Sequence, residues 1–448
     1  MQSSDSIGLL HSLLQFFYLQ RCGCDLPRDA AGAFAHPPCH DQLARIYGTD
    51  VKVDVTGGWH DAGDYGRYTV PAAKAVADLL LSYLTAPNAY SIFRFLPDAV
   101  LLQSGTALPD LLLEIRYELT WLLKMQRADG AVYHKVSCAD FCGFVLPQFE
   151  TDELIVSPVS TTATGDFAGV MALAYMAYRA LDAAFAATCL QAAERAYAFL
   201  KNTPPIPFHN PAQIHTGEYD DDVDTDERFF AAAALHAATG CAGYGWDALA
   251  LSASDFPVSL GWADMGGYGC LVCLYAKDCV LPQLYTLASE RLAQCAEGLF
   301  SASSEDSFGI SLSDVFLWGS NMYLASNAVL LCEAARLLHM PAYKAAAQRH
   351  VSYLLGNNPL SVCYVTGYQN ASPRHPHHRP SAAVGQAMPG MLVGGPAGGL
   401  YDDCAKTHLQ GKPGISCYID AQESYSTNEV AIYWNSSLVY LLSLLFLT

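Results

Sequence analysis

The sequence predicts an all-α protein whose helices form two concentric layers. Apolar residues recur at helical spacing, as in Leu112, Ile115, Leu119 and Leu122, and the alternating pattern of a β-strand is almost absent. Many of the helical stretches are apolar almost all round, so each must be covered on both sides. Two layers of helices would provide that cover. No Ser/Gly-rich or charged linker interrupts the chain, which indicates one domain over residues 1-448.

About a dozen helices are expected, each an Ala/Leu-rich stretch followed by a loop rich in Gly, Pro or Asp. The loops, which are also rich in His and Trp, are where we expect a site on such a scaffold. The clearest helices span Ser6–Gln20, Ala72–Thr85, Leu111–Gln126, Phe167–Ala184, Leu190–Lys201, Glu227–Ala238, Gly266–Ala276, Leu284–Phe300, Asn321–Leu338, Ala342–Leu355 and Glu429–Leu447.

Composition excludes several classes of protein. Of the 448 residues, 52% are hydrophobic and only 15% are charged, which excludes a disordered chain. With 24 basic residues and a net charge of −19, the chain is poorly suited to bind nucleic acid. The best candidate for a membrane span, Leu438–Leu447, is shorter than the ~20 residues that a span needs. We therefore expect that the protein binds neither nucleic acid nor a membrane. We also expect it to be a monomer.

The N-terminus and the cysteines indicate where the protein works. Met1–Gln20 is amphipathic and has neither a positively charged leader nor a small-residue cleavage site, so it does not predict a signal peptide. The 15 cysteines are scattered, several of them in apolar helical runs, as is typical of reduced core thiols. We expect a cytoplasmic protein, or a secreted one if a leader precedes this sequence.

The first loop with chemistry spans residues 54–68 and reads DVTGGWHDAGDYGRY. Asp61 and Asp64 stand three residues apart, so a turn or helix would point both carboxylates the same way. Two close carboxylates can share a water, one as base and the other as orienter. Alternatively, Asp61 caps the following helix and Asp64 is solvated, and the spacing leaves both interpretations open.

A third carboxylate, Glu429, is expected to open the last helix within the apolar run STNEVAIYWN. An acid that faces an aromatic pocket has a raised pKa, which a general acid needs. The alternative is an ordinary first-turn Glu behind a Ser426/Thr427 cap.

The loop Ser372–Ser381 holds three histidines and two arginines between prolines. His375, His377 and His378 are too close together to face one metal ion, so hydrogen bonding to many hydroxyl groups is the better interpretation. Aromatic residues that could stack on sugar rings, or lie in the core, are Trp59, Trp121, Tyr133, Tyr219, Trp318 and Trp434.

Ten motifs in order give the sequence a resemblance to family 9 of the glycoside hydrolases, the inverting cellulase family with an (α/α)6 barrel. Each motif is a weak signal, but the ordered set is specific and runs over essentially the whole chain. The motifs are FYLQRCG, GAFAHPPCHD, DVTGGWHDAGDYGRYTV, LLKMQRADGAVYHKV, VSPVSTTATGDFAGVMA, DERFFAAAALHAATG, WGSNMYLASNAVLL, YLLGNNPLSVCYVTGY, PRHPHHRPS and STNEVAIYWNSSLV.

The resemblance implies roles for the three carboxylates. Asp64 would be the general base for the attacking water, Asp61 its helper and Glu429 the general acid. The implied activity is that of a cellulase, an endo-β-1,4-glucanase, which hydrolyses β-1,4 bonds in β-glucans and cello-oligosaccharides with inversion, with the acid and base ~6.5–9.5 Å apart. The resemblance also places His377 and Arg379 on substrate hydroxyls, and His134 and Trp318 along the cleft. Tyr219 and Trp434 are the other expected substrate contacts.

A second constellation is Cys22, Cys39, His40 and His60. Two thiolates and two imidazoles make a complete tetrahedral set for structural zinc, and the spacing Cys-x16-Cys-His-x19-His resembles the zinc site of the subgroup with WHDAGDYGRY. Cys24 could replace Cys22, and the four residues could also be unrelated. The resemblance further implies a calcium site among acidic residues, for which the candidates are Asp222, Asp226, Glu227 and Asp264, with Asp221 and Asp224 nearby.

The chain departs from the subgroup because it starts at the first barrel helix, so we expect neither an immunoglobulin-like domain nor a carbohydrate-binding module. Such a catalytic domain suits soluble glucans better than crystalline cellulose. If the segment Phe141–Leu154 blocks one end of the cleft, the enzyme would be exo-acting. An exo-β-glucosidase or exo-β-glucosaminidase is therefore the alternative enzyme; a non-catalytic glycan-binding relative and a zinc hydrolase are the alternatives from other classes.

Overall fold

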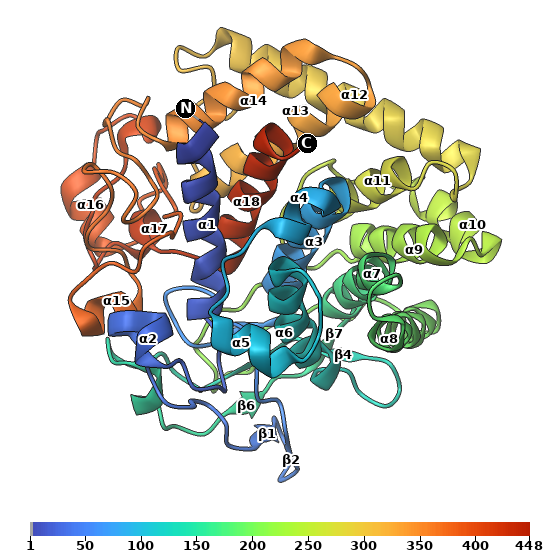
Figure 1. The fold of residues 1–448 in the computed structure, drawn as a ribbon, viewed down its shortest axis with the longest axis horizontal. Helices are drawn as coiled ribbons and strands as arrows, with labels where there is room; N and C mark the ends of the chain where they lie inside the picture. The colour runs from blue at the N-terminus through green and yellow to red at the C-terminus, as the bar shows by residue number, and fades with distance from the viewer. Residues whose placement is uncertain (1–2) are drawn as a thin grey trace.

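The structure, a computed structural model, describes residues 3–448, and its main helices alternate along the chain between an outer and an inner layer (Figure 1). The predicted all-α, double-layered fold is thus confirmed. The outer helices are half-buried and comprise α1 (Ser3–Leu19), α6 (Asp110–Lys124), α8 (Ala183–Lys201), α10 (Ala242–Leu251), α12 (Pro282–Glu305) and α14 (Pro341–Leu354).

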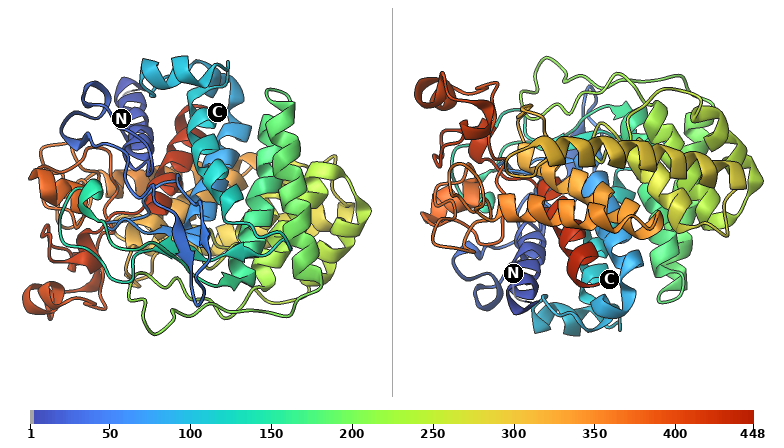
Figure 2. Two further views of the ribbon diagram at one scale, coloured as in Figure 1. Left: turned by 90° about the horizontal axis from the view of Figure 1, so that it is seen from below. Right: turned by 90° about the horizontal axis from the view of Figure 1, so that it is seen from above.

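The inner helices are buried on almost every side, which explains why their sequences are apolar all round. The last inner helix, α18, packs against α3 and α13 and so closes the ring. From above, α12 and α14 lie over α13 (Figure 2). The inner helices are α3 (Thr69–Thr85), α7 (Thr161–Tyr178), α9 (Thr225–Thr239), α11 (Gly266–Tyr275), α13 (Ser320–Leu337) and α18 (Ile432–Phe446).

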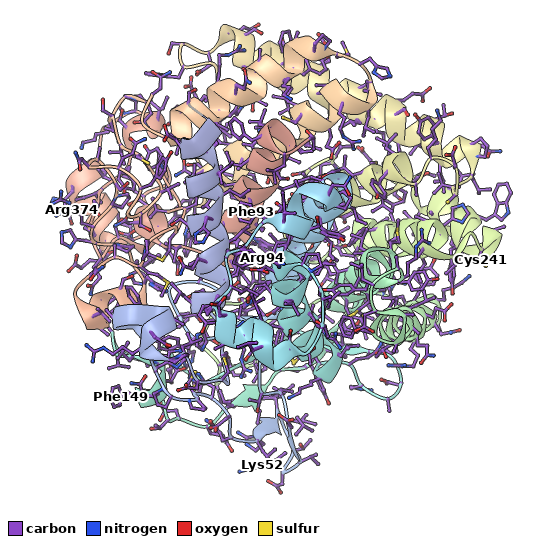
Figure 3. All side chains as sticks on the ribbon, in the orientation of Figure 1. Lys52, Phe93, Arg94, Phe149, Cys241 and Arg374 are labelled. Atoms are coloured by element: carbon purple, nitrogen blue, oxygen red, sulfur yellow. The ribbon has the colours of Figure 1, made fainter. Side chains whose placement is uncertain are left out.

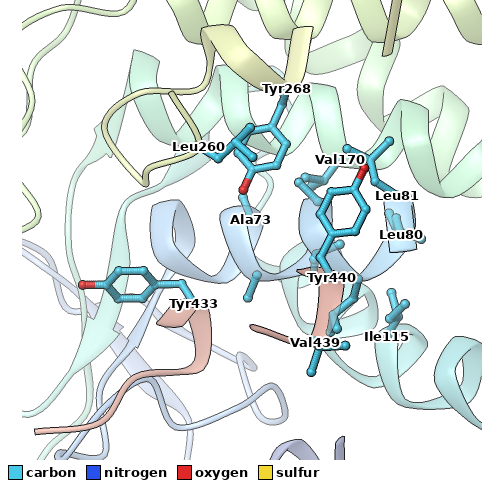
Figure 4. Close-up of a cluster of buried hydrophobic side chains, with 14 of the residues drawn as sticks. Ala73, Leu80, Leu81, Ile115, Val170, Leu260, Tyr268, Tyr433, Val439 and Tyr440 are labelled. Carbon is cyan, nitrogen blue, oxygen red and sulfur yellow. The ribbon is translucent and has the colours of Figure 1, made fainter. Parts of the chain in front are cut away.

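Buried hydrophobic side chains of α3, α6, α7, α11 and α18 form part of the core (Figure 4). Leu80 of α3, Val170 of α7 and Val439 of α18 are all fully buried there. Small residues let the helices approach closely: a Cβ added at Gly169 of α7 would lie 2.3 Å from the ring of Phe230 on α9. Interiors packed to this density tolerate no added volume.

One charged pair lies inside this core. The ammonium of Lys74 donates to Asp78 Oδ2 (2.5 Å) and to the carbonyl oxygen of Tyr433 (2.8 Å). The hydroxyl of Tyr268 donates to Asp78 Oδ1 (2.6 Å). Both charges are therefore hydrogen-bonded, as buried charges must be, and the pair holds the backbone of Tyr433 at the start of α18.

Within residues 3–448, seven strands of two or three residues lie in the loops, although the sequence showed almost no strand pattern. A strand so short has no room for alternation to appear. They are β1 (Ala44–Ile46), β2 (Lys52–Val53), β3 (Arg67–Tyr68), β4 (Val132–Tyr133), β5 (Lys135–Ser137), β6 (Ile155–Val156) and β7 (Val159–Ser160).

Five of these strands form a sheet in the order β2-β1-β6-β5-β3, and β4 pairs with β7. In the sheet Arg67 lies opposite Val136 and Tyr68 opposite Lys135, in antiparallel register. Because β3 directly follows the loop that carries Asp61 and Asp64, the sheet fixes the end of that loop.

The predicted helices are confirmed, with two boundary errors that matter. Helix α7 begins at Thr161 rather than Phe167 and ends at Tyr178, before a turn. Glu429 does not open the last helix: it is extended, forms a bridge with His377, and α18 begins three residues later at Ile432.

The sequence also missed α10 and several short helices. The short helices are α2 (Arg28–Ala31), α4 (Pro87–Ile92), α5 (Asp98–Ser104), α15 (Arg379–Val384), α16 (Asp403–Leu409), α17 (Tyr425–Asn428) and the 3-10 turns η1 (Gly32–Phe34), η2 (Pro147–Phe149) and η3 (Gly414–Ser416). Among residues 3–448, no helix combines the length and apolarity that crossing a bilayer requires.

Candidate active site

A cavity of about 410 Å³ lies where the connections enter the inner helices. Apart from Phe141, its residues come from the segments that lead into α3, α9, α11, α13 and α18 or from the first turns of α13 and α18, so it lies at the N-terminal ends of these helices. Helix N-termini favour negative charge. The lining residues are Asp61, Ala62, Asp64, Tyr68, Phe141, Gly217, Glu218, Tyr219, Asp220, Trp262, Trp318, Tyr323, Glu429, Ala431, Tyr433 and Trp434.

All three predicted carboxylates, Asp61, Asp64 and Glu429, line this one cavity. The hydroxyl of Tyr219 donates to Asp61 Oδ2. Asp64 Oδ2 accepts from the hydroxyl of Tyr68 (2.8 Å) and from the backbone N–H of Gly66 (3.0 Å). The other oxygen of Asp61, Oδ1, is buried with no protein partner among the described residues, so it is available to a water molecule.

Asp64 and Glu429 have different surroundings, which favour the charged form of Asp64 and the protonated form of Glu429. Burial raises the pKa of Glu429 well above its usual range, and the neighbouring Asp64 and Asp61 carboxylates raise it further, against a smaller opposing effect of the Arg379 guanidinium. Burial also raises the pKa of Asp64, but the Arg379 guanidinium and the donors Tyr68 and Gly66 oppose that rise. Glu429 therefore holds its proton more firmly, and Asp64 is the better-supported anion.

Backbone hydrogen bonds join the loop of the two aspartates to the segment of Glu429. The N–H of Arg379 donates to the carbonyl of Gly63 (3.0 Å), and the N–H of Ile432 donates to the carbonyl of Asp61 (2.8 Å). A Cβ added at Gly63 would lie 2.3 Å from the carbonyl oxygen of His377. The two segments thus touch backbone to backbone, and only glycine fits between them.

Aromatic side chains cover much of the cavity wall. Trp318, Tyr219 and Trp434 line it as predicted, and Trp318 keeps 41% of its surface exposed. Four further aromatic residues line the cavity although sequence reasoning assigned them no role in the site: Tyr68, which ends the motif GDYGRY, Tyr433, which lies in NEVAIYW, and Trp262 and Tyr323. Phe141, which opens the segment Phe141–Leu154 considered above as a block at one end of the cleft, also lines the cavity.

His134 was predicted along the cleft, but it does not line the cavity. It is fully buried, with Nδ1 2.9 Å from Ser160 Oγ and Nε2 3.1 Å from the carbonyl oxygen of Glu218. Its ring stacks on Phe208 at 3.8 Å. Its position therefore supports the Glu218–Tyr219 wall from behind.

His377 and Arg379 were predicted on substrate hydroxyls, and neither lines the cavity. Arg379 is 7% exposed. Its Nη1 donates to the carbonyl oxygen of Gly63 (2.8 Å) and its Nε donates to the carbonyl oxygen of Cys142 (3.0 Å). His377 Nδ1 lies 2.6 Å from the carbonyl oxygen of Gln422. Both side chains brace the segments that carry the acid and the base.

The predicted metal ligands Cys22, Cys39, His40 and His60 form one buried cluster, with their ligand atoms within 4.8 Å of one another. His40 Nδ1 lies 3.3 Å from His60 Nε2 and 3.8 Å from Cys22 Sγ, and Cys39 Sγ lies 3.9 Å from His60 Nε2. Zinc–nitrogen bonds of ~2.0–2.1 Å in a tetrahedron would separate two nitrogens by about 3.3–3.4 Å. The residues fit the ion, and Cys24 is not in the cluster.

The sequence missed a partner of this cluster, Glu150. Its carboxylate lies 2.9 Å from His40 Nε2, the nitrogen that faces away from the other three ligands. A carboxylate behind a ligating histidine fixes the ring and its tautomer. No sequence signal links residues that are 110 positions apart.

The predicted calcium ligands are only partly brought together. Asp226 Oδ2 accepts from the N–H of Met265 (2.7 Å), next to Asp264, and Glu227 is fully buried with no hydrogen bond to either oxygen. Asp222, which was predicted as a calcium ligand, does not join them, because its side chain is exposed and lies 3.4 Å from His209.

The carboxylates near Asp226 and Glu227 are those of Asp166 and Asp221. Asp166 is fully buried and unpaired, and the nearby Asp226 and Asp221 carboxylates add to burial in raising its pKa well above its usual range. The pKa of Asp221 is raised to about 6, chiefly by burial.

Comparison with known proteins gives consistent matches. A sequence profile of glycosyl hydrolase family 9 matches residues 8–442. The cellodextrinase of Butyrivibrio fibrisolvens is 39% identical over 457 residues, covering 97% of this chain and 83% of that protein. A single-mutant thermostable endoglucanase from Alicyclobacillus acidocaldarius is 42% identical with a TM-score of 0.94, and the structure of AaCel9A in complex with cellobiose-like isofagomine is 43% identical with a TM-score of 0.93. Each alignment covers 98% of this chain and 84% of the solved one.

The close approach at Gly63 generates a prediction. Gly63→Ala should lower the free energy of unfolding by about 1–3 kcal/mol, as overpacking does, and should slow glycoside hydrolysis because the acid and base segments are pushed apart. Urea unfolding and turnover measure the two effects. Gly298→Ala is the control: a Cβ there meets nothing within 4 Å, and alanine favours the α12 helix. If Gly63→Ala kept the wild-type stability and turnover, the close approach of the two segments at Gly63 would not be what holds the acid and base in place.

Proposed function

Because this chain belongs to glycosyl hydrolase family 9, and is therefore a glycoside hydrolase, we propose that it hydrolyses β-1,4 bonds of β-glucans and cello-oligosaccharides with inversion. The observation that carries the proposal is the meeting of Asp61, Asp64 and Glu429 in one aromatic-lined cavity. The cellodextrinase relative and the bound cellobiose-like ligand of AaCel9A support this class of substrate.

The proposed mechanism uses each carboxylate once. Glu429 donates its proton to the glycosidic oxygen as the bond to the anomeric carbon breaks. A water attacks that carbon from the opposite face, and Asp64 accepts the proton that the water loses. Asp61 orients the water through its unpaired Oδ1 while Tyr219 holds its other oxygen. Trp318 and Trp434 present flat apolar faces to the sugar rings.

The acid and base are tested by Glu429→Gln and Asp64→Asn. Each change should lower kcat by ~10²–10⁴-fold, since it removes one proton-transfer group, and steady-state kinetics on cellotetraose measures the loss. Glu423→Gln serves as control because Glu423 is exposed and outside the cavity lining. Near-wild-type kcat in either test variant removes that residue from the mechanism.

The stereochemical course is tested by proton NMR during early hydrolysis of a β-glucan. Attack by water on the face opposite the leaving group should release the α-anomer first, before mutarotation. Early accumulation of the β-anomer would instead mean retention, with a covalent intermediate, and would exclude the water-mediated scheme.

We propose that Cys22, Cys39, His40 and His60 bind structural zinc. Four protein ligands leave no open position on the ion, so its contribution is to fold and not to chemistry. Cys22 and His60 come from segments already joined by backbone hydrogen bonds, Cys22 N–H to Gly58 and His60 N–H to Gln20 (both 2.8 Å). The ion would fasten the end of α1 to the loop that carries Asp61.

Elemental analysis tests the zinc site. Purified protein should hold about one zinc per chain, and Cys39→Ser should lose the metal together with thermal stability, because binding to the folded state is folding free energy. Cys24→Ser should keep both, since Cys24 is outside the cluster. Metal-free protein purified without chelator, or Cys39 in a disulfide, would refute the site.

We also propose that calcium binds at Asp166, Asp221, Asp226 and Glu227. The unpaired, fully buried oxygens of Asp166 and Glu227 are hard ligands of the type that calcium takes, and a cation would relieve their mutual repulsion. Added calcium should therefore raise Tm, and Asp166→Asn should reduce that increase, whereas Asp222→Asn should not. A Tm unaffected by calcium in chelator-treated protein would refute this site.

We further propose that the protein works in the cytoplasm. All 15 cysteines lie within residues 3–448 and each is a free thiol there, which suits a reducing compartment. Recovery of the native protein from the extracellular fraction would contradict this.

A further inference from the structure

A loop of residues 139–145, here called the Phe141 loop, crosses from one wall of the cavity to the other. On one side, the carbonyl of Ala139 accepts from His215 N–H (2.7 Å), and the Asp140 carboxylate lies 2.6 Å from His215 Nδ1. His215 leads directly into the wall formed by residues 217–220. On the other side, the carbonyl of Cys142 accepts from Arg379 Nε (3.0 Å), in the segment that adjoins Glu429.

The same loop is fastened to the segment of the two aspartates. The hydroxyl of Tyr65 donates to the carbonyl of Val145 at 2.5 Å. Three neighbouring segments therefore fix the Phe141 loop, and it bounds the cavity on this side.

The ring of Phe141 is the feature that the loop presents to the cavity. Phe141 lines the cavity although 47% of its surface is exposed. The guanidinium carbon of Arg379 lies 5.2 Å from the Phe141 ring centre and 5.8 Å from that of Phe144. Phe144 in turn meets the His377 ring edge-on at 5.3 Å. Arg379 thus steadies both rings.

We propose that Phe141 is a sugar-stacking residue, and that the Phe141 loop limits how many glucosyl units can lie beyond it, which makes short soluble cello-oligosaccharides the preferred substrates. A half-exposed phenyl ring in a carboxylate-bearing cavity offers the apolar C–H face of a pyranose a surface to cover. The inference rests on the proposed hydrolysis of β-1,4-glucans and adds the substrate length and the residue that sets it.

Kinetics on cellotriose through cellohexaose test the proposal with three variants. Phe141→Leu keeps apolar volume but loses the flat ring, so KM should rise about three- to tenfold with kcat little changed, the signature of lost uniform binding. Phe141→Tyr keeps the ring and should keep the wild-type KM. Phe149→Ala is the control on the same segment, since Phe149 is 65% exposed at the edge of the molecule (Figure 3) and does not line the cavity.

The outcomes separate this inference from the proposed function. Wild-type kcat/KM should stop rising at a short oligosaccharide, and cellohexaose should gain nothing over cellopentaose. An unchanged KM in Phe141→Leu overturns the stacking role, and kcat/KM that keeps rising to long chains overturns the limit on length. A wild-type enzyme that cleaves no β-1,4-glucan overturns the proposed function itself.

Discussion

The backbone contact between Gly63 and the segment around His377 and Glu429 is the constraint on which the site depends. An acid and a base on opposite faces of one bond must be held at a fixed separation, yet here they belong to segments that are 365 positions apart in the chain. The contact is possible because α3 and α18, which these segments precede, are neighbours in the inner ring. Closing the barrel and assembling the site are therefore one event.

Three carboxylates in one buried cavity repel one another, and the fold offsets that repulsion in several ways. The cavity lies at helix N-termini, whose partial positive charge favours anions. Tyr68 and Tyr219 donate to two of the carboxylates, and Arg379 adds a full positive charge nearby. The remaining repulsion between the carboxylates favours the protonated form of Glu429, which is the form that a general acid needs. Electrostatic strain at such a site is a normal cost of function.

The parts of the molecule that depend on local pattern could be predicted from sequence, and the parts that depend on distant partners could not. The 3.6-residue period identified all the helices of the two layers except α10. Glu429 was placed in a helix because its neighbours are apolar, but its backbone pairs with His377 and so becomes extended. Arg379 and His134 were expected to contact substrate, but neither lines the cavity: Arg379 donates to the carbonyls of Gly63 and Cys142, and His134 Nε2 lies beside the carbonyl oxygen of Glu218. The four candidate zinc ligands could be identified from sequence because two cysteines and two histidines form a specific ligand set, whereas their partner Glu150 could not.

The position of α18 has a consequence for how the protein folds during its synthesis on the ribosome. This helix closes the inner ring and is buried on nearly every face, but about 360 residues separate its start from that of α3, its neighbour. At ~5–20 residues per second, the growing chain waits on the order of 20–70 s between making the two. During that interval the apolar surface of α3 that α18 will cover has no native partner. The nascent barrel is thus a natural client for chaperones that shield unfinished hydrophobic cores.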